Sequence, residues 1–196
     1  TKNLPTEEIK LIEEMYKQIR EQAPNAKLLV QTYFEALSSY ERLIQLPVDG
    51  FGLDFVHGEK QNLKSIQEHG FPKEKTLSIG VINGRDIWSV NLAEAVLTIS
   101  TVKQLTQAEN LWISSSCSLQ HVPVSKNIEQ KLPQELFDHL AFADEKIREI
   151  AHITYYIQKG SWLKEGLVSN SMKVIEALAT HPIRKNERVE KALAEL

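Results

Sequence analysis

The sequence has little cysteine, no strong excess of either charge and no long apolar run. With the single cysteine Cys117, no internal disulfide can form, and a disulfide-rich secreted scaffold is excluded. The formal net charge of −3 gives no electrostatic reason to expect a nucleic-acid partner. No apolar run approaches the ~20 residues that cross a bilayer, so we expect no membrane partner. The first five residues lack the features of a signal peptide, and we expect a cytoplasmic location.

The composition is that of a folded chain. Hydrophobic residues make up 42 % and charged residues 25 % of the 196 positions, which argues against a mostly disordered protein. A chain of this length forms one domain, or a large part of one, and buries about 70 % of its surface on folding.

Four short apolar segments alternate with segments of helical periodicity, which predicts a parallel α/β fold. Two architectures fit this order: an open doubly wound sheet, or part of a (β/α)8 barrel. No G-x-G-x-x-G turn follows a strand, which disfavours dinucleotide binding, and four strands are half of a barrel that takes about 250 residues. The expected strands are 27–34, 52–56, 76–82 and 111–115, and the expected helices are 6–22, 39–45, 61–69, 91–105 and 135–158, with further breaks near Gly160 and Pro182. The fold class that these elements predict is α/β, with about four parallel strands and flanking helices, and both architectures stay open at this point.

Polar and titratable residues follow the expected strands, at the end where parallel α/β proteins carry out their chemistry. As a functional site, this rim would supply acid, base and anion-binding groups. As structure, the same residues cap the strand ends and pair with one another, and we favour this second interpretation. Asp54 lies within an apolar strand and needs a partner if buried, for which Arg85 is a candidate. The rim residues are Asp54, His57, Asn83, Arg85, Asp86, Cys117 and His121.

Cys117 and His121 could serve one of two chemical functions, as metal ligands or as a nucleophile with its base. One Cys and one His, even with His57 added, are few ligands for zinc, and no C-x-x-C or H-E-x-x-H spacing occurs, so we expect no metal site. A Cys–His nucleophile pair of a hydrolase is conceivable, but no third group is evident to orient it. Cys117 is more often a small buried apolar residue, and Trp112 is expected to be a packing anchor.

Several segments resemble the cobalamin-independent methionine synthase family. They occur in the family's order and cover about residues 25–150, and Asn-Gly-Arg-Asp-Ile-Trp is the most specific of them. The segments are LLVQTYF (28–34), LPVDG (46–50), LDFVHG (53–58), GVINGRDIW (80–88), SSSCSLQHVP (114–123) and LAFADEK (140–146).

The resemblance implies a place in a larger enzyme. Members of the family have two (β/α)8 barrels face to face and transfer a methyl group from 5-methyltetrahydrofolate with a glutamate tail to homocysteine. Residues 1–196 resemble the second half, strands five to eight, of the N-terminal barrel, with a leading helix in 1–24 and a helical C-terminal part in 125–196. The resemblance therefore implies that the fold is a partial TIM (β/α)8 barrel of about four parallel strands with flanking helices. The family's zinc ligands, homocysteine contacts and catalytic histidine lie in the second barrel, and its folate contacts lie in earlier segments. No catalytic residue and no cofactor are therefore assigned to this segment, and zinc belongs to the parent enzyme.

We therefore expect a structural segment of a methyltransferase that is inactive alone. Its expected partners are the missing half of the same barrel and the C-terminal catalytic barrel. A half-barrel has two open edges and an apolar face without cover, which favours self-association. Two alternatives remain: a module that binds a small anion through Arg85 and His57, and a hydrolase that uses Cys117 and His121.

Overall fold

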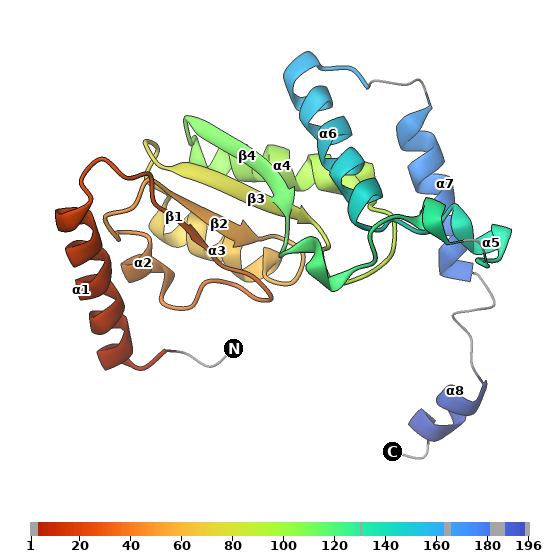
Figure 1. Cartoon of the computed structure of the whole chain (residues 1–196), viewed down its shortest axis with the longest axis horizontal. Coiled ribbons are helices and arrows are strands. Elements are labelled where there is room, and N and C mark those ends of the chain that lie inside the picture. The colour runs from red at the N-terminus through yellow and green to blue at the C-terminus, as the bar shows by residue number, and fades with distance from the viewer. Residues whose placement is uncertain (1–3, 130, 163–165, 181–186, 195–196) are drawn as a thin grey trace.

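The computed structural model describes residues 4–129, 131–162, 166–180 and 187–194. Its centre is one parallel sheet in the order β1-β2-β3-β4, which confirms the α/β fold class with four parallel strands (Figure 1). In this part of the chain β1 and β4 are the edge strands. The strands are β1 (Leu29–Gln31), β2 (Gly50–Asp54), β3 (Thr76–Ile82) and β4 (Asn110–Ser115).

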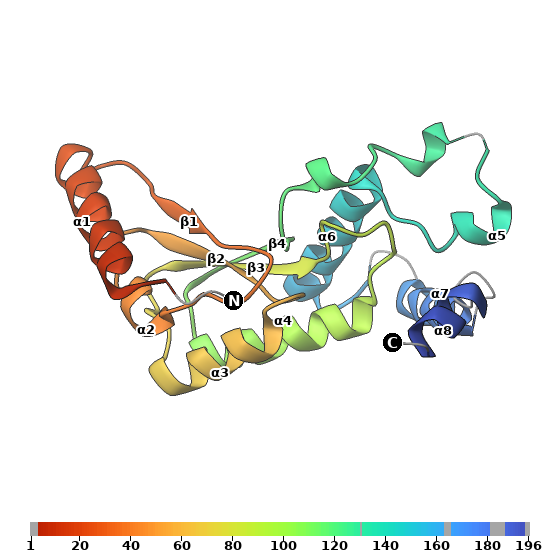
Figure 2. The ribbon, with the colours of Figure 1, turned by 90° about the horizontal axis from the view of Figure 1, so that it is seen from below.

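The helices lie mainly on one face of the sheet. Figure 2 shows α3 and α4 beneath the strands, whereas the opposite face faces the viewer in Figure 1 without a helix in front of it. Helix α6 packs beside β3 and β4. The helices are α1 (Thr6–Gln22), α2 (Tyr40–Leu43), α3 (Glu59–His69), α4 (Leu92–Thr106), α5 (Gln134–Phe137), α6 (Ala143–Lys159), α7 (Leu167–Thr180) and α8 (Glu187–Ala194), with 3₁₀ turns at Leu119–His121 and Lys126–Ile128.

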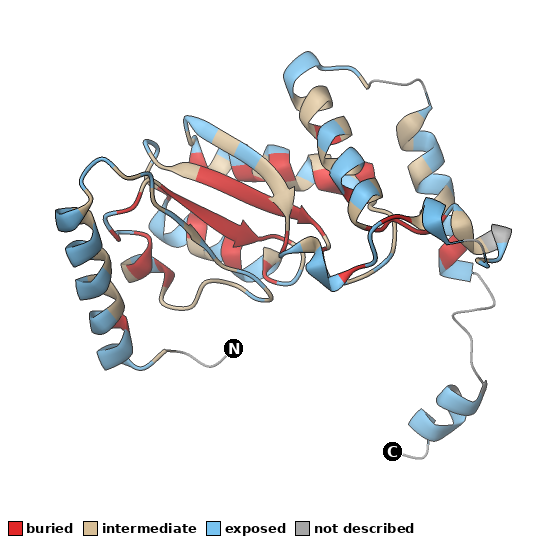
Figure 3. Cartoon of the chain, in the orientation of Figure 1, coloured by how far each residue is buried: buried red, intermediate tan, exposed pale blue. Residues whose placement is uncertain are grey.

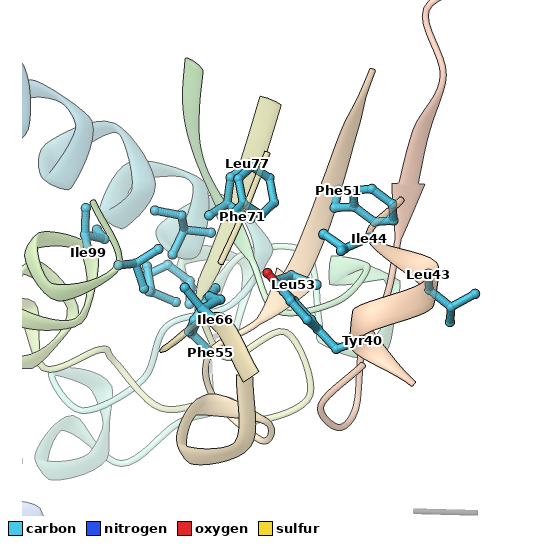
Figure 4. Close-up of a cluster of buried hydrophobic side chains, with 14 of the residues drawn as sticks. Tyr40, Leu43, Ile44, Phe51, Leu53, Phe55, Ile66, Phe71, Leu77 and Ile99 are labelled. Carbon is cyan, nitrogen blue, oxygen red and sulfur yellow. The ribbon is translucent and has the colours of Figure 1, made fainter. Parts of the chain in front are cut away.

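The core lies between the sheet and its helices. Phe51, Leu53 and Leu77 alternate along β2 and β3 with residues of the other face and are fully buried. They belong to one cluster with Ile66 of α3 and Ile99 of α4 (Figure 4). Each such side chain contributes roughly 1.5–3 kcal/mol when it leaves water. The central strands are accordingly the most continuously buried part of the molecule (Figure 3).

The other face of the sheet carries small and polar residues together with Trp112. Gly52 lies beneath the side chain of Gln31, which would overlap a Cβ at that position. Ser78 Oγ donates to Ser114 Oγ at 2.9 Å across β3 and β4. Trp112 is 55 % exposed, because no helix formed by the described residues covers this face, so the expectation that it anchors the packing is wrong. The uncovered face is mixed in polarity, whereas the sequence led us to expect an apolar one.

The first strand is much shorter than the expected 27–34. Pairing with β2 is limited to Leu29–Gln31, and the Thr32 N–H still donates to the Gly52 carbonyl at 2.9 Å. Two residues later Phe34 has a φ of 76°, which breaks the extended conformation.

The expected helix over 135–158 is two helices. Residues 139–141 between α5 and α6 pair with the loop after β3: Ser89 N–H donates to the His139 carbonyl at 2.9 Å, and Ala141 N–H donates to the Ile87 carbonyl at 2.8 Å. Leu140, within this stretch, is 3 % exposed. Burial and strand-like pairing at this point therefore outweigh the helical periodicity.

After α6, the described residues of the C-terminal part form α7 and α8. Gly160 has a φ of 70° and ends α6, a backbone conformation that favours glycine. The predicted break near Pro182 lies outside the described residues. None of the helices in the described ranges is long and apolar enough to cross a membrane.

Candidate functional site

Asp54, the last residue of β2, organises the carboxyl ends of the first two strands. Its carboxylate is fully buried. Oδ1 accepts the N–H groups of Val56 and His57, both at 2.8 Å, and Oδ2 accepts the Phe34 N–H at 2.8 Å. Three backbone donors therefore satisfy a charge that could not otherwise be buried.

The His57 ring also contacts this carboxylate. His57 Nδ1 lies 3.1 Å from Asp54 Oδ2. Because an ionised carboxylate can only accept, Nδ1 carries the proton of this bond and Nε2 is the nitrogen left for another group. The His57 side chain is 31 % exposed, so that group can come from outside the chain.

Phe34 joins the first strand end to the third and fourth. The Arg85 guanidinium lies 4.6 Å from the centre of the Phe34 ring, and the His121 ring lies 5.8 Å from it. A positive φ is rare for a bulky residue and costs on the order of 1–3 kcal/mol, which the bond to Asp54 offsets. Arg85 therefore contacts Phe34, and the sequence-based pairing of Asp54 with Arg85 is wrong because backbone N–H groups and His57 occupy the carboxylate.

Asn83 and Asp86 bond to each other in the loop after β3. Asn83 Nδ2 donates to Asp86 Oδ2 at 2.8 Å, and Asp86 Oδ1 accepts from Lys146 Nζ at 3.2 Å. Lys146 also donates to the Trp88 carbonyl at 3.0 Å and is 1 % exposed. The carboxylate that follows Arg85 in the chain is therefore bound to a lysine of α6.

Cys117, after β4, is buried against the β3 loop. A Cβ on Gly84 would lie 2.8 Å from Cys117 Sγ and 2.7 Å from its carbonyl oxygen, so only glycine fits there without a shift. Burial raises the pKa of the Cys117 thiol, whereas a nucleophilic cysteine needs a lowered one. The expectation of a small buried apolar residue is confirmed.

A cavity of about 290 Å³ lies beside this rim, between the β3 loop and the helices α3 and α4. Three carboxylates line it, and Thr98 Oγ1 donates to one of them, Glu59, at 2.7 Å. The other two are Asp86 and Glu94. This acidic lining does not suit an anion.

The structure thus gathers the sequence-predicted residues into two neighbouring groups. Asp54, Arg85 and His121 contact Phe34, and His57 joins this group through Asp54. Asn83 bonds to Asp86, which in turn bonds to Lys146. Cys117 lies beneath Gly84. Sequence reasoning missed the roles of Phe34 and Lys146. Lys146 lies in an otherwise helical segment and gave no signal of burial, and Phe34 looked like the end of an apolar strand.

Within the described ranges, no group of three or more His, Cys, Asp or Glu side chains could hold a metal ion. Cys117 Sγ donates instead to the Ser118 carbonyl at 3.7 Å, and His57 bonds to Asp54.

The fold and its rim define a class: a parallel α/β protein with polar residues gathered at the carboxyl ends of its strands, consistent with a partial (β/α)8 barrel. Residues 1–107 match the family model described as "Cobalamin-independent synthase, N-terminal domain". The chain therefore belongs to the cobalamin-independent synthase family.

Curated relatives extend the match over nearly the whole chain. A protein of Bacillus cereus (strain G9842) is 39 % identical over 191 residues, which cover 97 % of this chain and 25 % of the relative. A protein of Bacillus cytotoxicus is 42 % identical over 195 residues, 99 % of this chain and 26 % of the relative. Both are named 5-methyltetrahydropteroyltriglutamate–homocysteine methyltransferase. The chain thus spans about a quarter of the length of the curated relatives that it matches.

Proposed function

We propose that this chain is a section of a methyltransferase that moves a methyl group from 5-methyltetrahydropteroyltriglutamate to homocysteine, and that within it the section is structural. The similarity to proteins of that name over 97 % of the chain supports the first part. The observation that carries the second is the engagement of the rim groups in internal bonds. Asp54 accepts three backbone N–H groups, and Asp86 is bound to Asn83 and Lys146.

The residues here do not fit the zinc ion that the family resemblance implies for the whole enzyme. Zinc takes four ligands, or three with a water molecule. Cys117 is buried against Gly84, His121 packs on Phe34 and His57 bonds to Asp54. No step of methyl transfer is assigned to this section, and zinc belongs to the remainder of the enzyme in this proposal.

The hydrolase alternative loses support for the same reason. No bond between Cys117 and His121 is found in the described part of the chain, and the thiol is buried with a raised pKa. The remaining alternative, an anion site at Arg85, is favoured by the position of the Arg85 guanidinium over the Phe34 ring.

The proposed partners are the other half of the same barrel and the C-terminal catalytic barrel of a cytoplasmic enzyme. The edges of β1 and β4 are open within the described residues, and Leu29 and Trp112 are exposed next to them. We expect the isolated 196-residue chain to self-associate through these edges. Native mass spectrometry would show dimers or larger species, and a single monomer at all concentrations would contradict this expectation.

A chimera tests the function. The 195-residue stretch of the Bacillus cytotoxicus relative that matches this chain is replaced by it, and homocysteine methylation is measured. We expect an active chimera, an inactive deletion of the stretch, and near-normal activity of Cys117→Ala and His121→Ala in the chimera. An inactive, folded chimera would refute the family function. Loss of turnover in a folded Cys117→Ala chimera, or methyl transfer by this chain alone, would refute the structural role.

A further inference from the structure

The Arg85 guanidinium lacks a carboxylate partner among the described residues. Arg20 and Arg42 both have one, Asp49 at 2.7 Å and Glu13 at 2.6 Å. The carboxylate next to Arg85 in the chain, Asp86, is bound to the buried Lys146 instead. Lys146 thus takes the place of Arg85 at Asp86, and Arg85 is left exposed at the strand ends with no carboxylate partner in the described part of the chain.

Arg85 is nevertheless held in place. Its N–H donates to Asn83 Oδ1 at 2.9 Å, and the preceding Gly84 packs against Cys117. The guanidinium lies over the Phe34 ring, a contact that orders the side chain while its N–H groups stay available. An ordered cation loses less conformational entropy on binding than a mobile one.

The ring beneath Arg85 is itself fixed by an uncommon backbone conformation. Phe34 has a φ of 76°, and its N–H bonds to Asp54 Oδ2. The same oxygen accepts from His57 Nδ1, so one buried carboxylate fixes both the aromatic ring and the imidazole. Backbone strain of this kind is concentrated at functional sites.

We propose that Arg85, carried on Phe34 beside His57, binds the carboxylate group of a small organic acid. The planar fork of a guanidinium matches a carboxylate in a bidentate contact, and His57 Nε2 is available as a second polar group. The carboxylates of Asp54 and Asp86 lie close by, and they repel a phosphate dianion, which brings both charges to the site, more than a single carboxylate group at the end of a carbon chain. This assignment does not depend on the methyltransferase proposal.

The test is a titration of the 196-residue chain with glutarate, followed by amide chemical shifts in NMR, and a parallel titration with inorganic phosphate at equal ionic strength. We expect saturable shifts at Phe34, His57 and Arg85. Arg85→Ala should weaken glutarate binding about tenfold, and Arg85→Lys, which keeps the charge but loses the fork, about threefold. Arg148→Ala is the matched control, because Arg148 is exposed on α6 away from these contacts.

Three outcomes would overturn the proposal: no saturable shifts, unchanged binding by Arg85→Ala, or tighter binding of phosphate than of glutarate. Arg85 is exposed, so its variants should fold, and Arg85→Gln provides a second neutral variant for the comparison. The result of the chimera experiment is interpreted independently of the glutarate titration. An inactive chimera with intact glutarate binding would refute the methyltransferase proposal alone, and an active chimera without binding would refute this one alone.

Discussion

Lys146 Nζ of α6 lies 3.2 Å from Asp86 Oδ1 in the loop after β3, and the two residues differ greatly in exposure. The Lys146 side chain is 1 % exposed, whereas that of Asp86 is 36 % exposed. The pair joins a helix to a strand end 60 residues earlier in the chain. Because the cation is the buried member, the two partners should not be equivalent when either is removed.

Asp86→Ala should destabilise the chain more than Lys146→Met. The first leaves a buried ammonium with the Trp88 carbonyl as its remaining acceptor, at a cost of about 3–5 kcal/mol. The second leaves a partly exposed carboxylate that still bonds to Asn83, at a cost of about 1–2 kcal/mol. Urea unfolding measures both, with the exposed Arg148→Ala as control. A larger loss in Lys146→Met would contradict this account.

Asp54→Asn should destabilise the chain by about 2–4 kcal/mol. An amide has one acceptor oxygen, so its NH₂ group would face at least one of the backbone N–H groups that the carboxylate now accepts. Asp138→Asn, at an exposed position, should have little effect. Unfolding free energies of the two variants make the comparison, and equal values would show that Asp54 is not the organising group.

The rim was predictable from the sequence in its location but not in its bonding. Parallel strands place Asp54, Arg85 and Cys117 at one edge of the sheet, which the alternation of elements already indicates. Asp54 bonds to the backbone N–H of Phe34, which follows a different strand, β1. The partner of Asp54 therefore depends on the backbone conformation of Phe34. No local pattern reports a positive φ at a phenylalanine, because that conformation is imposed by tertiary contacts.

Gly84→Ala should destabilise the chain by about 1–3 kcal/mol, because the added Cβ would lie 2.7 Å from the Cys117 carbonyl oxygen and 2.8 Å from Sγ. Cys117→Ala removes the sulfur but leaves the carbonyl. In a Cys117→Ala background the Gly84→Ala cost should therefore fall by about 0.5–1 kcal/mol. Thermal or urea unfolding of all four chains completes the cycle, and strictly additive costs would rule out this contact.

Stability should fall as the pH rises through the range set by Glu149. Burial raises the pKa of Glu149 from 4.5 to about 7. The Val90 N–H, which donates to Glu149 Oε1 at 3.0 Å, lowers this pKa and so opposes part of the increase. Between those values the folded chain holds a proton that the unfolded chain has released, so each rise in pH favours unfolding.

Glu149→Gln removes this dependence. Relative to the unsubstituted chain, the free energy of unfolding of Glu149→Gln should rise by about 1–3 kcal/mol between pH 4.5 and pH 8. This range allows for the partial exposure of the side chain. Glu109→Gln, at an exposed position, should show no such gain. Unfolding curves across this pH range give the measurement, and parallel pH profiles for Glu149→Gln and the unsubstituted chain would contradict it.

The fold shows the same division between what the sequence indicates and what it does not. The strand at Thr76–Ile82 matches the predicted boundaries, because it is apolar throughout and bounded by turn residues. The helix expected over 135–158 fails at residues 139–141, where hydrogen bonds to Ile87 and Ser89 outweigh helical periodicity. Those partners lie some fifty residues earlier in the chain, beyond the reach of a local pattern.

The pairing of 139–141 with the β3 loop has a consequence for the segment that precedes it. Ser116 N–H donates to the Ile82 carbonyl at 2.7 Å where the chain leaves the sheet, and Ala141 N–H donates to the Ile87 carbonyl at 2.8 Å where it returns. The chain between Ser116 and Ala141 is thus a long connection whose two ends both bond to the short stretch 82–87 after β3. Doubling the length of such a connection costs only about 0.6 kcal/mol in closure entropy, so added residues there leave the sheet and α6 in register. Pro123 and Val124 also accept the N–H groups of Ala143 and Asp144 at the start of α6, so a foreign peptide is best inserted after them, at the exposed residues 127–129.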